Sequence, residues 1–168
     1  TLDYRPESRP ADDEGTPSHL TVLVEEGKVA SFIYDLQTAG LSGKKSTGNG
    51  GRNSVGSLSP APSSFVISPG KTGFQEMVKD VKEGLVIEYL MGASQGNVLS
   101  GDFSGNVLLG YKISNGEITG RIKNTMVSGN IYHLLKDIAA VGNDAKWEGD
   151  SINTPSFYFP RISVAVKN

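Results

Sequence analysis

The side chains that could support metal or nucleophilic chemistry are few in this chain of 168 residues. It contains no cysteine and only two histidines, His19 and His133, which lie far apart in sequence and in unrelated contexts. The lack of cysteine excludes disulfides, thiolate catalysis and zinc–thiolate sites. A catalytic zinc needs about three protein ligands, and serine or aspartate hydrolysis needs a nucleophile, a base and a group that orients the base. We therefore assign no catalytic residue and no metal ligand to this chain, and interpret both histidines as ordinary boundary residues.

Two charged segments match a functional pattern only in part. The adjacent acids Asp12, Asp13 and Glu14 suggest a cation site, but neighbouring side chains point in different directions, so we interpret them as a solvated arm or turn. The segment Gly43-Lys44-Lys45-Ser46 resembles the end of a phosphate-binding loop. The spacing Gly-x-x-x-x-Gly-Lys that such a loop requires is not met, and we reject that function.

The composition restricts the class of protein. A net charge of -2 gives no electrostatic reason to expect nucleic acid or an anionic membrane as a partner. No apolar run approaches the roughly 20 residues of a membrane helix, and no signal peptide is recognisable. The first residue is Thr1 rather than methionine, so we expect the sequence to be a fragment of a longer chain.

Two glycine-rich loops hold the candidate binding residues. The first covers residues 36–64 and the second residues 92–105, in a chain with 21 glycines. Loops of this length are often either functional or mere connectors. In the functional alternative they line a peptide cleft, with an exposed strand edge that adds the peptide as a further strand. The side chains that would pair with the peptide are Thr47, Asn49, Asn97, Asp102 and Ser104.

A first hairpin follows an irregular arm. Residues 1–19 lack periodicity, and we expect one domain over residues 20–168. Glu26-Gly27 predicts a two-residue turn that sets Val24 opposite Val29. Apolar residues on both faces of this hairpin indicate that both faces are at least partly covered.

A second hairpin turns at Asn115-Gly116, a strong hairpin signal. The register of such a turn sets Ile113 opposite Ile118 and Tyr111 opposite Gly120, with the aromatic ring covering the glycine.

Two amphipathic helices complete the pattern. One begins at a Thr72–Gln75 capping box and ends at Gly84; the other covers residues 130–140, with a buried apolar stripe. The segments 65–67, 85–91 and 157–166 are predicted strands, the second of them buried. Strands outnumber helices, so the predicted fold class is α+β, with a mostly antiparallel sheet built from hairpins.

Several segments, in order along the chain, resemble the C-terminal domain of the TldD/PmbA family, also called modulators of DNA gyrase. The resemblance covers most of residues 8–166, and its spacing favours the PmbA (TldE) side over the TldD side. Its motifs are Asp12–Gly15 with the hairpin ending Ser31–Asp35, Ser46–Asn49, Ser100–Ser104 followed by Gly110–Ile118, Ser128–Asn130 and Val141–Asp144.

The resemblance implies a cytoplasmic, dimeric zinc metallopeptidase that acts on unfolded peptides. In the family, the TldD-type chain carries a His-Glu-x-x-x-His helix and a cysteine ligand. Both are absent here, and the region that corresponds to the cysteine has Thr154 at the nearest position. The resemblance therefore implies a PmbA-like subunit without metal ligands, whose partner is a TldD-like subunit or a second copy, and in which zinc belongs to the catalytic partner.

Two alternatives remain open. The chain could be a non-enzymatic, β-rich module that binds a peptide or a glycan, or a scaffold. Trp147, in a polar segment, could be either a core residue or an interface residue.

Overall fold

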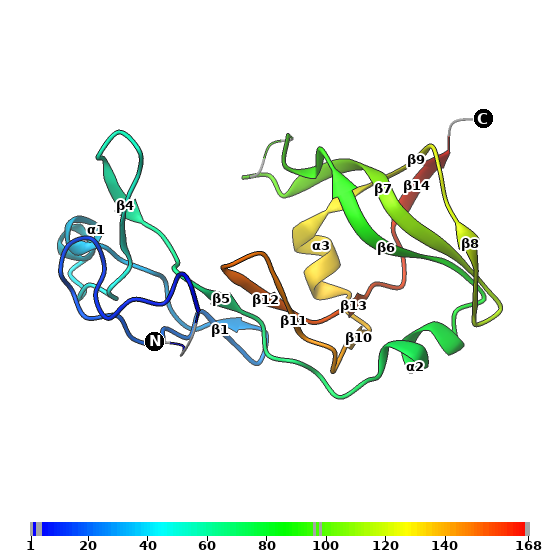
Figure 1. Ribbon diagram of the computed structural model, residues 1–168, viewed down its shortest axis with the longest axis horizontal. Coiled ribbons are helices and arrows are strands. Elements are labelled where there is room, and N and C mark those ends of the chain that lie inside the picture. Colours follow the sequence, from blue (N-terminus) through cyan, green and yellow to red (C-terminus); the bar gives the residue numbers. More distant parts are fainter. Residues whose placement is uncertain (1, 3–4, 96, 98, 167–168) are drawn as a thin grey trace. The chain divides into compact units, whose positions relative to one another are not determined.

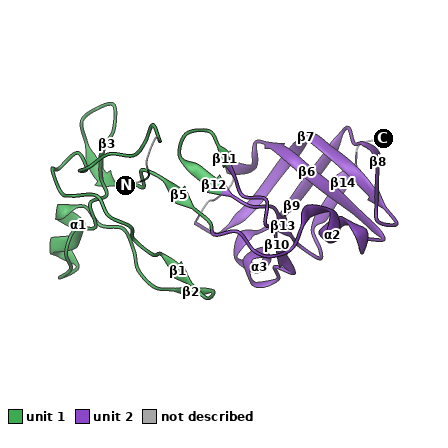
Figure 2. Ribbon diagram, turned by 60° about the horizontal axis from the view of Figure 1, so that its bottom comes forward, with its two compact units in different colours: residues 1–67, 147–153 green, residues 68–146, 154–168 purple. Residues whose placement is uncertain are grey.

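A computed structural model describes residues 2, 5–95, 97 and 99–166 (Figure 1). The chain divides into two compact units, residues 1–67 with 147–153 and residues 68–146 with 154–168 (Figure 2). The arm, residues 1–19, belongs to the first unit together with residues 20–67. The expected division into an arm and one domain stays a prediction, because a unit defined by contacts need not fold separately.

The predicted fold class is confirmed. Strand pairs are mostly antiparallel, and the described part of the chain contains three short α-helices, so the protein is α+β. Two of these helices were predicted, and the first, α1 (Leu36–Leu41), was not. No helix in the described residues is long and apolar enough to cross a membrane.

The first unit begins with the predicted hairpin, β1 (Val24–Glu25) and β2 (Lys28–Val29), in the predicted register with Val24 opposite Val29. Glu26 and Gly27 have φ values of 49° and 76°, which is the left-handed pair that a two-residue turn requires. The prediction that both faces are at least partly covered is met at Leu23 and Ile33, which are half-buried, but it is wrong for the two strands themselves. Within the described structure Val24 is 60% exposed, Val29 67% and Phe32 64%.

The segment predicted as a long loop, residues 36–64, contains regular structure. α1 follows Asp35, whose carboxylate accepts from the Thr38 amide at 2.7 Å, while the Thr38 hydroxyl accepts from the Asp35 amide at 3.2 Å. This is a capping box in which threonine replaces the usual glutamate. Within the same segment, a further hairpin joins β3 (Gly50–Arg52) to β4 (Leu58–Pro60).

A three-stranded sheet has the order β11–β12–β5, formed by β11 (Lys146–Glu148), β12 (Ile152–Thr154) and β5 (Phe65–Val66). β12 and β5 are parallel. Trp147 is half-buried, and the Arg5 guanidinium lies 3.6 Å from its ring centroid, a cation–π contact.

The second unit is built on a five-stranded sheet. Its strands are β6 (Glu83–Met91), β7 (Asp102–Ser114), β8 (Glu117–Arg121), β9 (Thr125–Asn130) and β14 (Ser163–Val166). The order is β14–β9–β7–β6, with β8 also paired to β7. β10 (Ala140–Val141) and β13 (Phe157–Tyr158) form a separate pair, and η1 (Ala93–Gln95) precedes β7.

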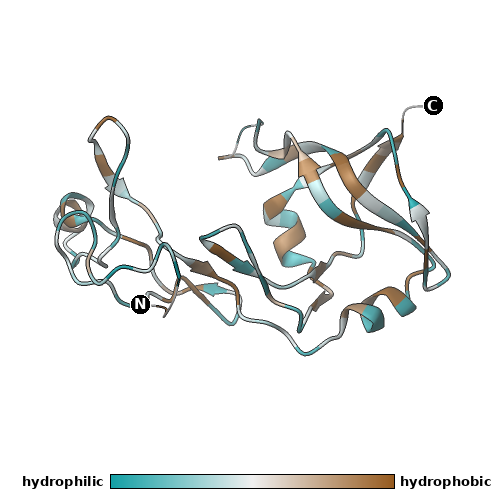
Figure 3. Ribbon diagram, viewed as in Figure 1, coloured by the Kyte–Doolittle hydropathy of each residue, from teal (hydrophilic) through white to brown (hydrophobic). Residues whose placement is uncertain are grey.

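The core of this unit lies between the sheet and α2 (Phe74–Lys79). Val78 and Val81 pack with Ile113 of β7 in one buried cluster. Figure 3 shows hydrophobic residues along α2, β6 and β7, the elements that make this contact. The apolar spacing that predicted the buried face of α2 is therefore confirmed, since Met77 is also buried.

The β7–β8 hairpin has the turn predicted at Asn115-Gly116, but part of the predicted strand register is corrected. Asn115 and Gly116 have φ values of 50° and 81°, and Ile113 lies opposite Ile118. A bulge follows this pair, so Gly120 lies opposite Lys112 and not opposite Tyr111. The predicted covering of Gly120 by an aromatic ring is wrong because the bulge inserts one residue into β8.

The ends of the helices also differ from the prediction. α2 starts after Gly73, which has no side chain to cap it, and Gly84 lies inside β6 instead of ending the helix. α3 (Ile131–Lys136) is shorter than residues 130–140, and none of its residues is buried.

The second loop and the strand before it need corrections too. Asp102 and Ser104 lie in β7 rather than in a loop, and residues 96 and 98 lie outside the described residues. The strand at 85–91 is only partly buried, since Tyr89 is 58% and Met91 53% exposed.

Candidate functional site

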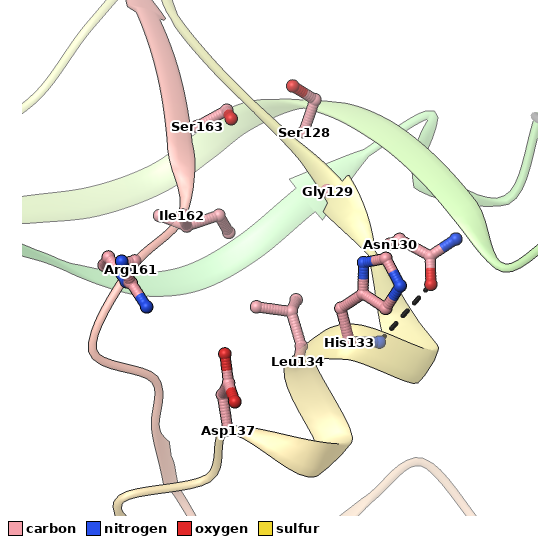
Figure 4. A pocket seen from close by; sticks show the side chains of 9 residues that line it. All are labelled: Ser128, Gly129, Asn130, His133, Leu134, Asp137, Arg161, Ile162 and Ser163. Atoms are coloured by element: carbon pink, nitrogen blue, oxygen red, sulfur yellow. Dashed lines mark hydrogen bonds between the residues drawn. The ribbon is translucent and has the colours of Figure 1, made fainter.

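A pocket of about 270 Å³ lies in the second unit where β9, β14 and α3 meet (Figure 4). β9 ends at Asn130, and the Asn130 side chain caps α3 by accepting from the amides of Tyr132 at 3.0 Å and His133 at 3.3 Å. The strand therefore runs directly into the helix. The lining residues are Ser128, Gly129, Asn130, His133, Leu134, Asp137, Arg161, Ile162 and Ser163.

The pocket opens because two strands separate. β14 pairs with β9 from Val166–Thr125 only as far as Ser163–Ser128. The chain at Arg161 and Ile162 then leaves the sheet, and within the described structure Gly129 has no strand partner on this side. On the other side Gly129 is paired with Phe103 of β7.

A polar cluster fixes the strand ends next to this pocket. The Asp102 carboxylate accepts from the Asn130 amide at 2.8 Å and from the Ser100 hydroxyl at 2.9 Å. These hydrogen bonds, of which that from Asn130 has the larger effect, lower the pKa of Asp102, and nearby His133 acts in the same direction. Asp102 is thus held as an anion at neutral pH.

The five predicted binding residues are divided between the two units. Asn97 and Asp102 are linked through Ser100: the Asn97 side chain accepts from the Ser100 amide at 3.4 Å, and the Ser100 hydroxyl donates to the Asp102 carboxylate at 2.9 Å. Ser104 follows on β7, and its hydroxyl contacts the Met126 sulfur at 3.4 Å.

Thr47 and Asn49 lie in the first unit. The Thr47 hydroxyl accepts from the Tyr34 amide at 2.7 Å, so it is already hydrogen-bonded to the main chain of this unit. The Asn49 amide donates to the Ala61 carbonyl at 3.4 Å, while its oxygen is buried without a hydrogen-bond partner among the described residues. A substrate-binding role for the five residues stays a prediction.

The sequence reasoning did not find the pocket residues. His133 was interpreted as a boundary residue, and Asp137 and Arg161 carried no signal, because they come from segments far apart in sequence. The motif Ser128-Gly129-Asn130 was the one available signal, since asparagine is a preferred helix cap and places the following turn beside the strand.

The acidic run Asp12-Asp13-Glu14 lies in a turn, one of the two predicted forms, but it is not solvated throughout, and that part of the prediction is corrected. Asp12 is only 7% exposed. Each acid accepts from a different backbone amide outside the run, Asp12 from Gly50, Asp13 from Arg52 and Glu14 from Leu36, each at 2.7 Å. The run joins the arm to α1 and β3 through hydrogen bonds.

Comparison with known proteins identifies the family. The family model described as the PmbA/TldA metallopeptidase C-terminal domain matches residues 1–166. The chain belongs to this family. It is 35% identical, over 95% of its length, to an uncharacterized protein of Methanocaldococcus jannaschii, covering 36% of that protein. It is 28% identical, over 94% of its length, to the metalloprotease PmbA of Escherichia coli O157:H7, covering 32% of it.

Solved structures of PmbA/TldD-type proteins have the same fold. TldE from Thermococcus kodakarensis aligns with a TM-score of 0.86 at 29% identity, over 96% of this chain and 38% of that one. A Thermotoga maritima protein provisionally named a modulator of a DNA gyrase aligns with a TM-score of 0.84 at 36% identity, over 98% of this chain and 38% of that one. The chain thus spans little more than a third of the length of these relatives.

Among the described residues of this PmbA/TldD-family domain, no side chains are grouped in a way that fits a zinc ion. His19 and His133 lie in different units. Among the described residues no group of three or more histidine, cysteine, aspartate or glutamate side chains could hold a metal. No catalytic step is derived through zinc for this chain.

Proposed function

We propose that this chain is the C-terminal domain of a PmbA-like subunit that lacks metal ligands. It contributes peptide-cleft walls and a dimer interface to a cytoplasmic zinc metallopeptidase that degrades or matures unfolded peptides. A TldD-like subunit, as the catalytic partner, supplies the zinc. The observation that carries the proposal is membership of a metallopeptidase family in a sequence with no cysteine and two separated histidines.

The sheet of the second unit supports the role in the cleft. β6 pairs with β7 on one side, and no strand pairs with its other side in the described residues. An unpaired edge can bind an extended peptide through main-chain hydrogen bonds. Asp102 and Ser104 lie at the start of β7, where β7 pairs with β9, and the last residue of β6, Met91, is opposite Asn106, two residues further along β7.

The hairpin β1–β2 supports the role in the interface. Leu20 and Val22 precede it, and together with Val24, Val29 and Phe32 they form a run of exposed apolar side chains. Val24 and Val29 lie opposite each other in the hairpin, and exposed apolar side chains that lie together can mark a protein–protein interface. We propose that a TldD-like subunit covers this hairpin.

The proposal is tested by zinc content and unfolded-peptide cleavage, measured for the full-length protein with and without a TldD-like partner. Zinc and cleavage are expected only in the mixture. Zinc bound by this protein alone would overturn the assignment of the metal to the partner. Absence of both in the mixture would favour the alternative, a peptide- or glycan-binding module without peptidase activity.

The interface is tested by Val24→Lys combined with Val29→Lys. Both side chains are more than half exposed, so the stability of the subunit should change by less than about 1 kcal/mol. Two lysines buried against an apolar partner should weaken association more than about 100-fold. Sedimentation of the mixed subunits measures this.

Val55→Lys is the matched control, because Val55 is 85% exposed and lies outside the hairpin. Association should be unchanged by it. The hairpin variant could instead lose folding stability and still associate with the partner. That result would mean that the rest of the same chain covers the hairpin, and it would contradict the proposal.

A further inference from the structure

The pocket between β9, β14 and α3 presents two opposite charges that the described structure does not pair with each other. Figure 4 shows Arg161, beside β14, and Asp137, at the end of α3, among the side chains that line the pocket, with no interaction drawn between them. The ion pairs found in the described residues do not include either side chain. A cation and an anion that line the same pocket without an ion pair between them offer complementary contacts to a molecule that carries both charges.

The remaining lining supplies the other elements of a binding site. Leu134 and Ile162 provide an apolar wall between the two strands and the helix. Gly129 lies beyond the last β9–β14 pair and is paired with Phe103 of β7 on its other side, so on the pocket side it lines the wall without a side chain. A site with a small number of placed polar groups and an apolar wall is typical of small-molecule recognition.

The volume limits the size of the ligand. At about 270 Å³ the pocket is smaller than the usual range for drug-sized molecules. A free amino acid or a dipeptide is a zwitterion of suitable size, with a carboxylate for the planar guanidinium of Arg161 and an ammonium group for Asp137.

We propose that this pocket binds a short zwitterion, a free amino acid or dipeptide with an apolar side chain, with its carboxylate on Arg161 and its ammonium group on Asp137. Peptide hydrolysis releases molecules of this class, but the assignment rests on the pocket alone. It does not require the zinc-bearing partner, so it can fail or stand independently of the proposed function.

The test is saturation-transfer NMR on the full-length protein, without any partner subunit, using leucine and leucyl-leucine as probes. Both should bind in the millimolar range or tighter, because the pocket is open to solvent. N-acetyl-leucine lacks the ammonium group and leucinamide lacks the carboxylate. Each blocked probe should bind at least about fivefold more weakly, since each loses one charge contact.

Variants locate the binding. Arg161→Gln and Asp137→Asn should each weaken leucyl-leucine binding about tenfold or more, whereas Lys136→Gln, an exposed charge on α3 outside the lining, should leave it unchanged. Equal binding of the blocked probes, binding unaffected by Arg161→Gln, or no binding at all would overturn the proposal. In those cases Arg161 and Asp137 serve only as solvated surface charges. Matching circular dichroism spectra of all variants show that folding is retained.

Discussion

Gly116→Ala is expected to lower the free energy of unfolding of the second unit by about 3–5 kcal/mol. Two effects add. Gly116 has a φ of 81°, a conformation that costs a residue with a Cβ about 1–2 kcal/mol. A Cβ at this position would also clash with the carbonyl oxygen of Lys79 at the end of α2. That oxygen belongs to the backbone, so relief requires the helix and the hairpin to separate.

The contact is part of the packing between α2 and the sheet. The Gly116 amide donates to the Val81 carbonyl at 2.9 Å, and the Asn115 amide donates to the Lys82 carbonyl at 2.8 Å. Separation of the turn from the helix end would weaken both hydrogen bonds as well as the adjacent cluster of Val78, Val81 and Ile113.

Gly92→Ala is the matched control within the same unit. Gly92 has a φ of 82°, but its added Cβ would meet only the Gln95 side chain, at 3.6 Å. Gly92→Ala should therefore lower the free energy of unfolding only by the cost of the left-handed backbone conformation, about 1–2 kcal/mol. Urea unfolding of both variants measures the difference. Equal losses would show that the approach of Gly116 to α2 contributes nothing.

The turns were predictable because their chemistry is local. Glu26-Gly27 and Asn115-Gly116 require left-handed conformations that few residues adopt, so the pairs alone located both hairpins and fixed the nearest register. The register failed only beyond the bulge in β8, because a single inserted residue shifts every later pair and leaves no clear signal in the sequence.

Burial was less predictable, because it depends on what covers a face. The spacing of Met77, Val78 and Val81 correctly predicted the buried face of α2. The same reasoning placed Leu135 of α3 and Val24 of the hairpin inside, yet they are 53% and 60% exposed. Periodicity identifies an apolar face but not the surface that packs on it.

Sequence reasoning could predict only part of the candidate site. Asn97 and Asp102 come together because they are close in sequence and share Ser100 as a partner. The pocket joins Asn130 to Arg161 through the pairing of β9 with β14, a non-local contact that no motif in either segment encodes. Its charged residues could be recognised only after the strands were paired.

Asp12→Ala is expected to lower the free energy of unfolding by about 3 kcal/mol. The carboxylate accepts from the amides of Glu14 at 3.0 Å, Thr16 at 2.8 Å and Gly50 at 2.7 Å, and the residue is 7% exposed. Its removal leaves buried amides without a partner, each at a cost of about 1–3 kcal/mol before relaxation. Chemical denaturation, with hydrogen exchange at Gly50 as a local readout, measures the loss.

Asp13→Ala, the neighbouring control, should cost only about 1 kcal/mol, because Asp13 is a third exposed and its ion pair with Arg9 lies at the surface. A loss equal to that of Asp12→Ala would contradict the specific role of the buried carboxylate. Both carboxylates accept from an amide of β3, so the contrast tests whether the buried hydrogen bond to Gly50 contributes more than the exposed one to Arg52.

The pH dependence gives a second, independent test of Asp12. Burial opposes its ionised form, but hydrogen bonds from Gly50, Thr16 and Glu14, together with nearby Arg9, lower the pKa below its usual value of 3.8. A carboxyl group whose pKa is lower in the folded than in the unfolded state stabilises the fold above the unfolded pKa, and loses that effect as the pH falls through the folded pKa. The stability difference between the native protein and Asp12→Asn should therefore be constant above about pH 5 and shrink below about pH 4. A difference independent of pH would show that the shape of the side chain, and not its charge, holds Gly50 in place.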